Sequence, residues 1–181
     1  KYEERLLEYF KKENITLDIR ENDLKIISAP IDFFGLNCYN RRVVSASGAN
    51  VRESIAQNGG NFLQNGNEYY PDAIYDTVKI IKNDYGVNVP IYITENGIGF
   101  SNEKEENGIV LDEERIKYLE GSFSSLEKLK KEGISVNGYY LWSLMDNFEW
   151  ADGYAKRFGL VYVNYDTMER IPKDSFYWYK K

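Results

Sequence analysis

The stretch IYITENGIGF, residues 91–100, indicates the fold, because an alternating apolar run ends there in a carboxylate, Glu95, followed by an Asn-Gly pair. The alternation is typical of a buried strand, and Asn-Gly is typical of a turn. In sheets of parallel strands, the side chains at strand ends line ligand sites. The stretch therefore leaves two interpretations of Glu95: a residue that only ends a strand, or a reactive group at the mouth of a pocket.

The segments on either side of this stretch alternate between strand-like and helix-like patterns. Buried strands are predicted within residues 31–39 and 136–144. Residues 71–86 have Pro at the expected first helical position and Gly at the end, and residues 112–132 are followed by Gly. Both have the spacing and end residues of helices. The order strand, helix, strand, helix, strand predicts a parallel sheet.

The remaining segments give weaker patterns. Residues 2–12 have helical spacing, with acidic residues near the start and basic residues near the end. Residues 40–70 are rich in Gly and Asn and predict loops, and the charged run at 102–107 predicts a solvated loop. Residues 158–166 predict a strand or hairpin arm, and residues 173–181 a final helix.

Composition excludes several classes of function. The 181 residues contain no histidine, which removes Ser-His-Asp and Cys-His catalysis and His-ligated zinc. Acid–base chemistry must then use carboxylates, tyrosines or lysines. The single cysteine, Cys38, excludes an intrachain disulfide framework, and the net charge of −6 argues against nucleic-acid binding. No apolar run reaches the ~18 residues of a membrane span, so we expect a soluble, cytoplasmic chain without a membrane partner.

Polar or aromatic side chains stand at the carboxyl end of each predicted strand: Asn37 and Tyr39, then Glu95, then Trp142 and Ser143. These ends meet at one edge of a parallel sheet. Asn37 and Tyr39 are two residues apart, so both should project from the same face, with Cys38 pointing away. Agreement among three strands favours a pocket over a simple turn at Glu95.

Five ordered blocks resemble the family-one glycoside hydrolases, the β-glucosidase group. The blocks are DFFGLNCYN (32–40), TENG (94–97), LWSLMDNFEW (141–150), KRFGLVYV (156–163) and RIPKDSFYWY (170–179). The resemblance runs over nearly the whole chain. It implies an α/β fold, the (β/α)8 TIM barrel, with residues 1–181 forming the carboxyl-terminal part of a single catalytic domain and supplying strands six to eight.

The resemblance also implies roles for seven residues. Glu95 matches the catalytic nucleophile, and Tyr39 matches the tyrosine whose hydroxyl touches it. The other matches are substrate-binding: Asn37 facing the sugar, Trp142 beneath it, Glu149 and Trp150 on the far hydroxyls of the non-reducing sugar, and Phe158 as a pocket wall.

The implied activity is that of a retaining β-glycosidase, which hydrolyses terminal non-reducing β-D-glucosyl residues by double displacement. β-Glucosides or short cello-oligosaccharides are the expected substrates, and the chemistry requires no cofactor and no metal. The negative charge of Glu149 would repel a phosphate, which favours unphosphorylated sugars.

The general acid/base of the family lies in an Asn-Glu-Pro motif that this chain lacks. Asn67-Glu68 is followed by Tyr, and Asn102-Glu103 by Lys. The 181 residues are also fewer than the ~250 of a typical barrel. We therefore expect the amino-terminal portion of the barrel, possibly a separate chain, to supply the acid/base, and the chain to be inactive alone.

Other interpretations stay open. The chain could be a non-catalytic carbohydrate-binding or engineered half-barrel fragment, or a glycosyl-transferring member of the family. Trp142 and Phe158 could be core residues, and Asn37 a capping or bulge residue. Asp146 and Asp152 are expected to form Asx-type turns in a loop. Asn67, where the family usually has Trp, leaves the aglycone preference undefined.

Overall fold

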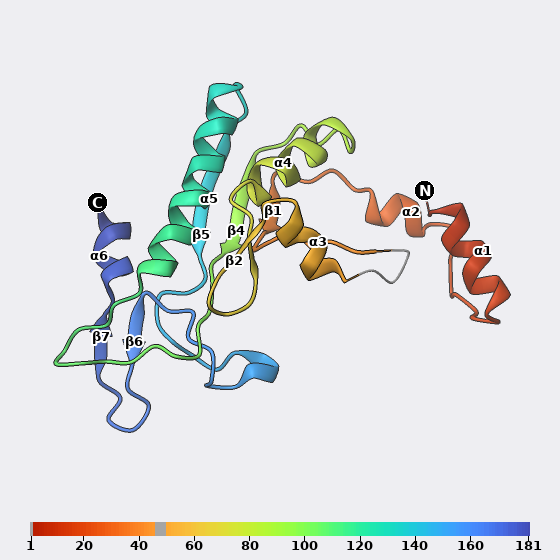
Figure 1. The fold of residues 1–181 in the computed structure, drawn as a ribbon. Coiled ribbons are helices and arrows are strands. Elements are labelled where there is room, and N and C mark those ends of the chain that lie inside the picture. Colours follow the sequence, from red (N-terminus) through yellow and green to blue (C-terminus); the bar gives the residue numbers. More distant parts are fainter. Residues whose placement is uncertain (1, 46–49) are drawn as a thin grey trace. The chain divides into compact units, whose positions relative to one another are not determined.

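A computed structural model describes residues 2–45 and 50–181 (Figure 1). The chain divides into two compact units, Lys1–Asp32 and Phe33–Lys181. The first contains α1 (Glu4–Lys12) and α2 (Asp23–Ile27). The helix predicted within residues 2–12 is confirmed, whereas α2 is too short for a periodic pattern to reveal it.

The second unit is built on a three-stranded sheet in the order β1-β4-β5, with both neighbouring pairs parallel. The strands are β1 (Phe34–Asn37), β4 (Ile91–Asn96) and β5 (Val136–Leu141). The predicted parallel sheet is therefore confirmed. Glu95 lies inside β4 and not after it, because the strand continues through Asn96.

Two helices connect the strands, α4 (Ala73–Asn83) and α5 (Glu113–Lys131). Pro71 stands two residues before α4 and not at its first position. Side chains from α4, β4 and α5 form one apolar core, in which Val78, Ile93 and Leu129 are fully buried. Burial of each such side chain contributes about 1.5–3 kcal/mol. The core thus fixes the helices on one face of the sheet.

The opposite face of the sheet is open among the described residues. Phe33 is 56% exposed and Tyr140 is 58% exposed. The ring of Phe33 contacts that of Tyr92 edge to face, with 5.5 Å between centroids. This face also carries Asn37 and Thr94, joined by a 2.7 Å hydrogen bond from the threonine hydroxyl.

The segment predicted to be loop-rich contains more regular structure than expected. It includes α3 (Val51–Gln57) and an antiparallel pair, β2 (Asn61–Phe62) with β3 (Glu68–Tyr69). A local cap explains α3, since the Asn50 side chain accepts a hydrogen bond from the Glu53 amide at 3.3 Å. The loop prediction at residues 46–49 lies outside the described residues.

The carboxyl-terminal part contains a short 3₁₀ helix, η1 (Trp150–Asp152), a hairpin and a helix. The hairpin pairs β6 (Val161–Val163) with β7 (Arg170–Pro172), and α6 (Asp174–Lys180) follows. Both the hairpin arm and the final helix are confirmed. None of the described helices combines the length and apolar character needed to cross a membrane.

Candidate active site

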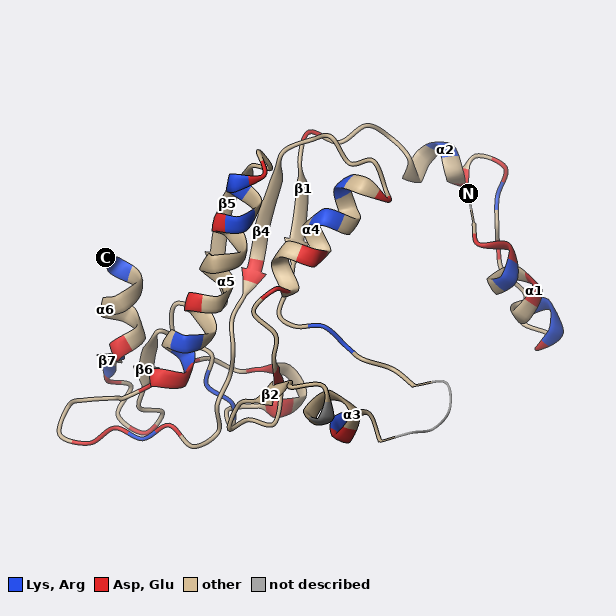
Figure 2. Cartoon of the chain, turned by 45° about the horizontal axis from the view of Figure 1, so that its top comes forward, with Lys and Arg blue, Asp and Glu red and all other residues tan. Residues whose placement is uncertain are grey.

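Glu95 and Tyr39 are brought together across neighbouring parallel strands. The Tyr39 hydroxyl donates to Oε2 of Glu95 at 2.7 Å. Burial and this contact raise the pKa of Tyr39, so the phenol keeps its proton at neutral pH. Glu95 is also the only charged residue of β1, β4 and β5, and Figure 2 shows the red segment on β4. The sheet therefore presents one carboxylate, oriented by one phenol.

Asn96, next to Glu95, fixes the strand ends from the buried side. Its amide donates to the Cys38 carbonyl at 2.6 Å and to the Tyr118 hydroxyl at 2.8 Å. The side-chain carbonyl of Asn96 accepts from the Tyr139 hydroxyl at 2.5 Å. Asn96 is buried whereas Glu95 lines the pocket, and the β4–β5 register shifts between Ile93 and Asn96 at this point. The turn prediction for Asn96 is wrong, because these contacts hold it within β4.

Cys38 lies on the buried side, as predicted. It is 6% exposed and belongs to the core formed with α4. Tyr39, the next residue, is half-buried and reaches Glu95. The backbone amide of Cys38 also donates to the carbonyl of Glu95 at 2.8 Å, which extends the strand pairing to the level of the carboxylate.

Two glycines after Glu95 allow close approach of neighbouring segments. A Cβ built on Gly97 would overlap the carbonyl oxygen of Trp142, and one on Gly99 would overlap the Phe158 ring. The ENGIG sequence thus has glycine where the backbone that follows β4 passes close to Trp142 and Phe158.

A pocket of about 430 Å³ opens in front of Glu95. Four of the predicted site residues line it: Tyr39, Glu95, Glu149 and Phe158. The rings of Tyr39 and Phe158 meet edge to face, at 90° and 6.4 Å between centroids. Arg42 and Lys156 also line the pocket, and the sequence analysis missed both. Lys156 stands two residues before Phe158 in the KRFGLVYV block. The block that predicts Phe158 as a pocket wall therefore also contains Lys156.

Trp142 holds Glu149 in place. The indole Nε1 donates to Oε2 of Glu149 at 3.1 Å. Trp142 follows directly after β5, is half-buried, and does not line this pocket. The contact connects the third strand with the loop that carries Glu149.

In the part of the chain that the structure describes, neither Asn37 nor Trp150 lines this pocket. Asn37 is exposed on the open face of the sheet, where the β1–β4 register shifts between Leu36 and Asn37. That irregularity agrees with the bulge interpretation of Asn37. Trp150 is 83% exposed. Their sugar-binding roles stay predictions.

Each of the three pocket carboxylates already has a hydrogen-bond partner. Besides Glu95 and Glu149, Glu68 lines the pocket, and its two oxygens accept from Nε and Nη2 of Arg41 at 2.9 and 2.6 Å. Both oxygens of Glu68 are therefore already engaged by Arg41. Across the described part of the chain, no three or more His, Cys, Asp or Glu side chains gather in a group that could hold a metal ion.

Two expectations for charged loop residues are wrong. Glu103, in the run predicted to be solvated, has a side chain only 5% exposed and pairs with Arg115 and Lys173. Asp146 has a fully buried side chain and accepts from Arg157 at 2.7 Å and Lys173 at 3.0 Å, not from an Asx turn. Their partners lie 11 to 70 residues away, so no local pattern reveals them.

Known proteins similar to this chain agree on one family. The model of "Glycosyl hydrolase family 1" matches residues 1–181. "Beta-glucosidase A" of Acetivibrio thermocellus is 42% identical over 100% of this chain and 41% of its own length. A "6-phospho-beta-galactosidase" of Leptotrichia buccalis is 37% identical over 91% of this chain and 40% of its own length.

Solved structures give the same result. A β-glucosidase from Exiguobacterium marinum superposes with a TM-score of 0.86 at 38% identity, over 99% of this chain and 41% of that protein. The β-glucosidase of Thermotoga maritima in complex with castanospermine gives 0.83 at 37% identity, over 99% and 40%. The chain spans about 40% of the length of the relatives it matches. These proteins imply a (β/α)8 barrel of which the chain covers a part. The chain belongs to glycosyl hydrolase family 1.

Proposed function

We propose that the chain is part of a retaining β-glycosidase that hydrolyses terminal non-reducing β-D-glucosyl residues. The observation that carries the proposal is the Tyr39–Glu95 hydrogen bond at the edge of a pocket. A carboxylate on a rigid strand, with one oxygen held by a neutral phenol, is oriented for attack on an anomeric carbon.

In this mechanism an oxygen of Glu95 forms a bond to the anomeric carbon while the bond to the leaving oxygen breaks. The leaving oxygen takes a proton from a second carboxylic acid, about 5–5.5 Å from the first. That group then acts as a base, removing a proton from the water that cleaves the glycosyl-enzyme. Glu149 and Phe158 would hold the sugar while these steps occur.

We propose that strands one to five, from an amino-terminal portion of the same barrel, supply the second carboxylic acid. The chain described here would supply strands six to eight. The outer position of β1 and β5 in the sheet supports this, as do the exposed rings of Phe33 and Tyr140 on its open face. Closing strands would cover both edges and that face.

The charge around Glu149 supports an unphosphorylated sugar. Glu149 accepts from an indole and not from a cation. Arg42 and Lys156 are the cations in the pocket lining, and Lys156 pairs with Asp152 at 2.9 Å. A phosphate at this position would meet a carboxylate, so we propose β-glucosides or cello-oligosaccharides over the phosphorylated class of the Leptotrichia relative.

A second candidate is sugar binding without hydrolysis. The Trp142–Glu149 contact favours it, because it orients the pocket-lining Glu149 without involving Glu95. A 2-deoxy-2-fluoro glycoside separates the two functions. Covalent mass at Glu95 supports the enzyme, whereas saturable sugar binding without labelling supports the binding protein.

The decisive experiment joins this chain to the amino-terminal portion of Thermotoga maritima β-glucosidase A, here called the completed barrel. We expect turnover of a chromogenic β-glucoside by the completed barrel and none by the 181-residue chain alone. Glu95→Gln is the control, and it should abolish turnover. Full turnover by the chain alone would refute the proposed division of the site, and a folded but inactive completed barrel would refute the activity.

A further inference from the structure

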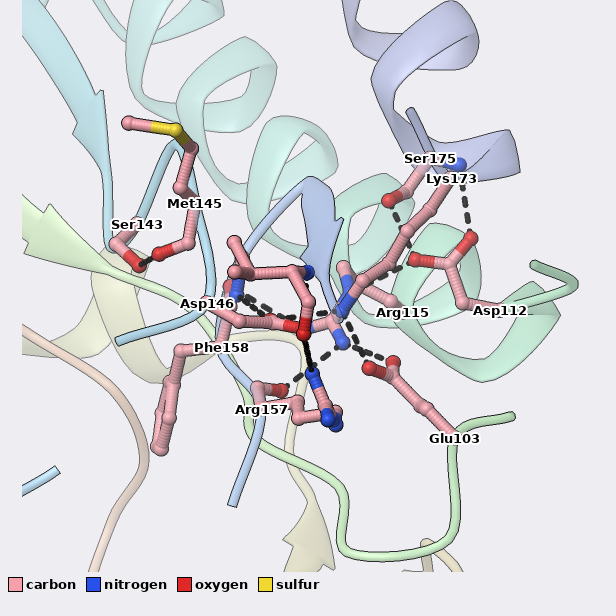
Figure 3. A network of polar contacts seen from close by, with 12 residues as sticks. Glu103, Asp112, Arg115, Ser143, Met145, Asp146, Arg157, Phe158, Lys173 and Ser175 are labelled. Carbon is pink, nitrogen blue, oxygen red and sulfur yellow. Dashed lines mark hydrogen bonds and ion pairs between the residues drawn. The ribbon is translucent and has the colours of Figure 1, made fainter. Parts of the chain in front are cut away.

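Six charged side chains form a cluster of ion pairs, drawn in Figure 3. Three are acidic and three are basic: Glu103, Asp112, Asp146, Arg115, Arg157 and Lys173. Arg157 is the most exposed of them, at 13% of its side chain. Burying such charges is costly even when they are paired. The contacts of each side chain therefore matter, because they identify the segments of the chain that the cluster connects.

Arg115, on the first turn of α5, is the centre of the cluster. Its side chain is 1% exposed, and a guanidinium has five N–H donors. All five are used. The acceptors are Oδ2 of Asp112, Oε1 of Glu103, and the carbonyl oxygens of Ile98, Phe158 and Arg157.

The three carbonyl acceptors belong to two walls of the pocket. Ile98 lies three residues after Glu95 and lines the pocket, and Phe158 lines it from the opposite segment. One planar group therefore holds both walls at a fixed separation. An ammonium, with three donors on a single nitrogen, cannot make the same set of contacts.

We infer that Arg115 is a positioning residue for the sugar pocket: it sets the spacing between the wall after β4 and the wall that carries Phe158. The inference rests on the proposed function for what the pocket binds. Arg115 itself does not line the pocket, so its effect on a sugar would pass through the backbone of these two walls.

Backbone contacts between the walls agree with this role. Phe100 and Arg157 exchange two backbone hydrogen bonds, of 3.2 and 2.9 Å. Asp146 then fixes the next residues, accepting from the Gly159 amide at 2.9 Å. The Arg115 contacts lie directly beside these bonds, because the Arg157 carbonyl accepts from both the Phe100 amide and Arg115.

The test is amide hydrogen exchange on the full 181-residue chain carrying Arg115→Lys. We expect exchange at the Phe100 and Arg157 amides to accelerate by ~10-fold or more, since their hydrogen bonds lose a neighbouring support. Amides in the middle of α5 should keep their protection. Unchanged exchange at Phe100 and Arg157, or equal acceleration over the whole chain, would overturn the inference.

Two further variants keep the test decisive. Glu103→Gln removes the charge of one partner of Arg115 but retains an acceptor oxygen, so it should accelerate the same amides by a smaller factor. This variant gives a result even if Arg115→Lys does not fold. Ser175→Ala is the matched control: its hydroxyl donates to Asp112 at 2.5 Å and contacts neither Arg115 nor the two pocket walls. This control should affect only α6, and loosening of Phe100 by Ser175→Ala would contradict the assigned role.

Kinetics in the completed barrel give a second readout. Arg115→Lys should raise KM for a β-glucoside about 10-fold with little change in kcat, because Tyr39 and Glu95 keep their contact. An unchanged KM in the variant would overturn the inference. If the unmodified completed barrel is inactive, the proposed function fails, and hydrogen exchange still decides the role of Arg115.

Discussion

The Tyr39 hydroxyl donates a 2.7 Å hydrogen bond to Glu95 across two adjacent parallel strands, where Asn37 and Glu95 are paired in register. Tyr39 stands two residues beyond the end of β1, so its side chain reaches the carboxylate from the neighbouring strand. Hydrogen bonds to charged groups contribute about 1.5–3 kcal/mol. The contact is therefore strong enough to decide the orientation of Glu95.

Replacing Tyr39 by Phe should lower kcat of the completed barrel by about 10- to 100-fold, since each ~1.4 kcal/mol of lost stabilisation is a factor of ten. Steady-state kinetics with a chromogenic β-glucoside measure the effect. Tyr75→Phe, which loses a hydroxyl contact with Glu132 outside the pocket, is the control and should leave kcat unchanged. Equal kcat values for Tyr39→Phe and the unmodified protein would show that Glu95 does not depend on the phenol.

Adding a methyl group at Gly99 should destabilise the chain, because the new Cβ would overlap the ring of Phe158. Overpacking of this kind costs about 1–3 kcal/mol. Urea denaturation of Gly99→Ala measures the cost. The double variant with Phe158→Leu should lose less stability than the sum of the two single variants, and simple additivity would mean that the ring and the methyl group never meet.

The sequence predicted the parts of the fold that depend on local pattern. Alternating apolar residues predicted β4, and apolar spacing with terminal glycines predicted α4 and α5. The limits of β4 were less certain, because Asn-Gly is a common turn pair. Asn96 instead stays in the strand through contacts with Tyr118 and Tyr139, which lie far along the chain.

The site was predicted only in part. The order of elements placed Glu95 and Tyr39 at the same edge of the sheet, and the family resemblance implied the contact between them. Arg115 could have been noticed, because it lies three and four residues before Tyr118 and Leu119, on the buried face of α5. Its partners could not, since Glu103 and Asp146 are ordinary charged loop residues until the chain folds.

Three tyrosines, one buried and two partly buried, should make the chain sensitive to alkali. Burial raises the pKa values of Tyr39, Tyr118 and Tyr139 above their ordinary value of 10.0. Above the ordinary value the unfolded chain loses protons that the folded chain retains. The resulting stabilisation is complete below pH ~10 and is lost as the pH rises towards the folded-state values.

Urea denaturation at a series of pH values, followed together with tyrosinate absorbance, measures this loss. We expect the free energy of unfolding to fall as the pH rises above ~10, with the last tyrosines ionising only as the chain unfolds. Tyr139→Phe removes one of the three groups and should make the fall less steep. Ionisation of all tyrosines in a chain that stays folded would contradict the prediction.

Substitution of Asp146 should strongly destabilise the chain. Its fully buried side chain accepts from Lys173 at 3.0 Å, Arg157 at 2.7 Å and the Gly159 amide at 2.9 Å. Asp146→Asn keeps the shape of the side chain but leaves two buried cations short of an anion. Breaking a buried pair in this way costs about 3–5 kcal/mol.

Asp152→Asn is a matched change in the same loop. Asp152 pairs with Lys156 at 2.9 Å, but its side chain is 46% exposed. Exposed pairs four residues apart contribute only about 0.3–0.5 kcal/mol, because water and salt screen them. Chemical denaturation should therefore separate the two variants by several kcal/mol. Equal stabilities would mean that water reaches Asp146 and solvates the charges around it, and the cluster would then be too loose to hold the pocket walls.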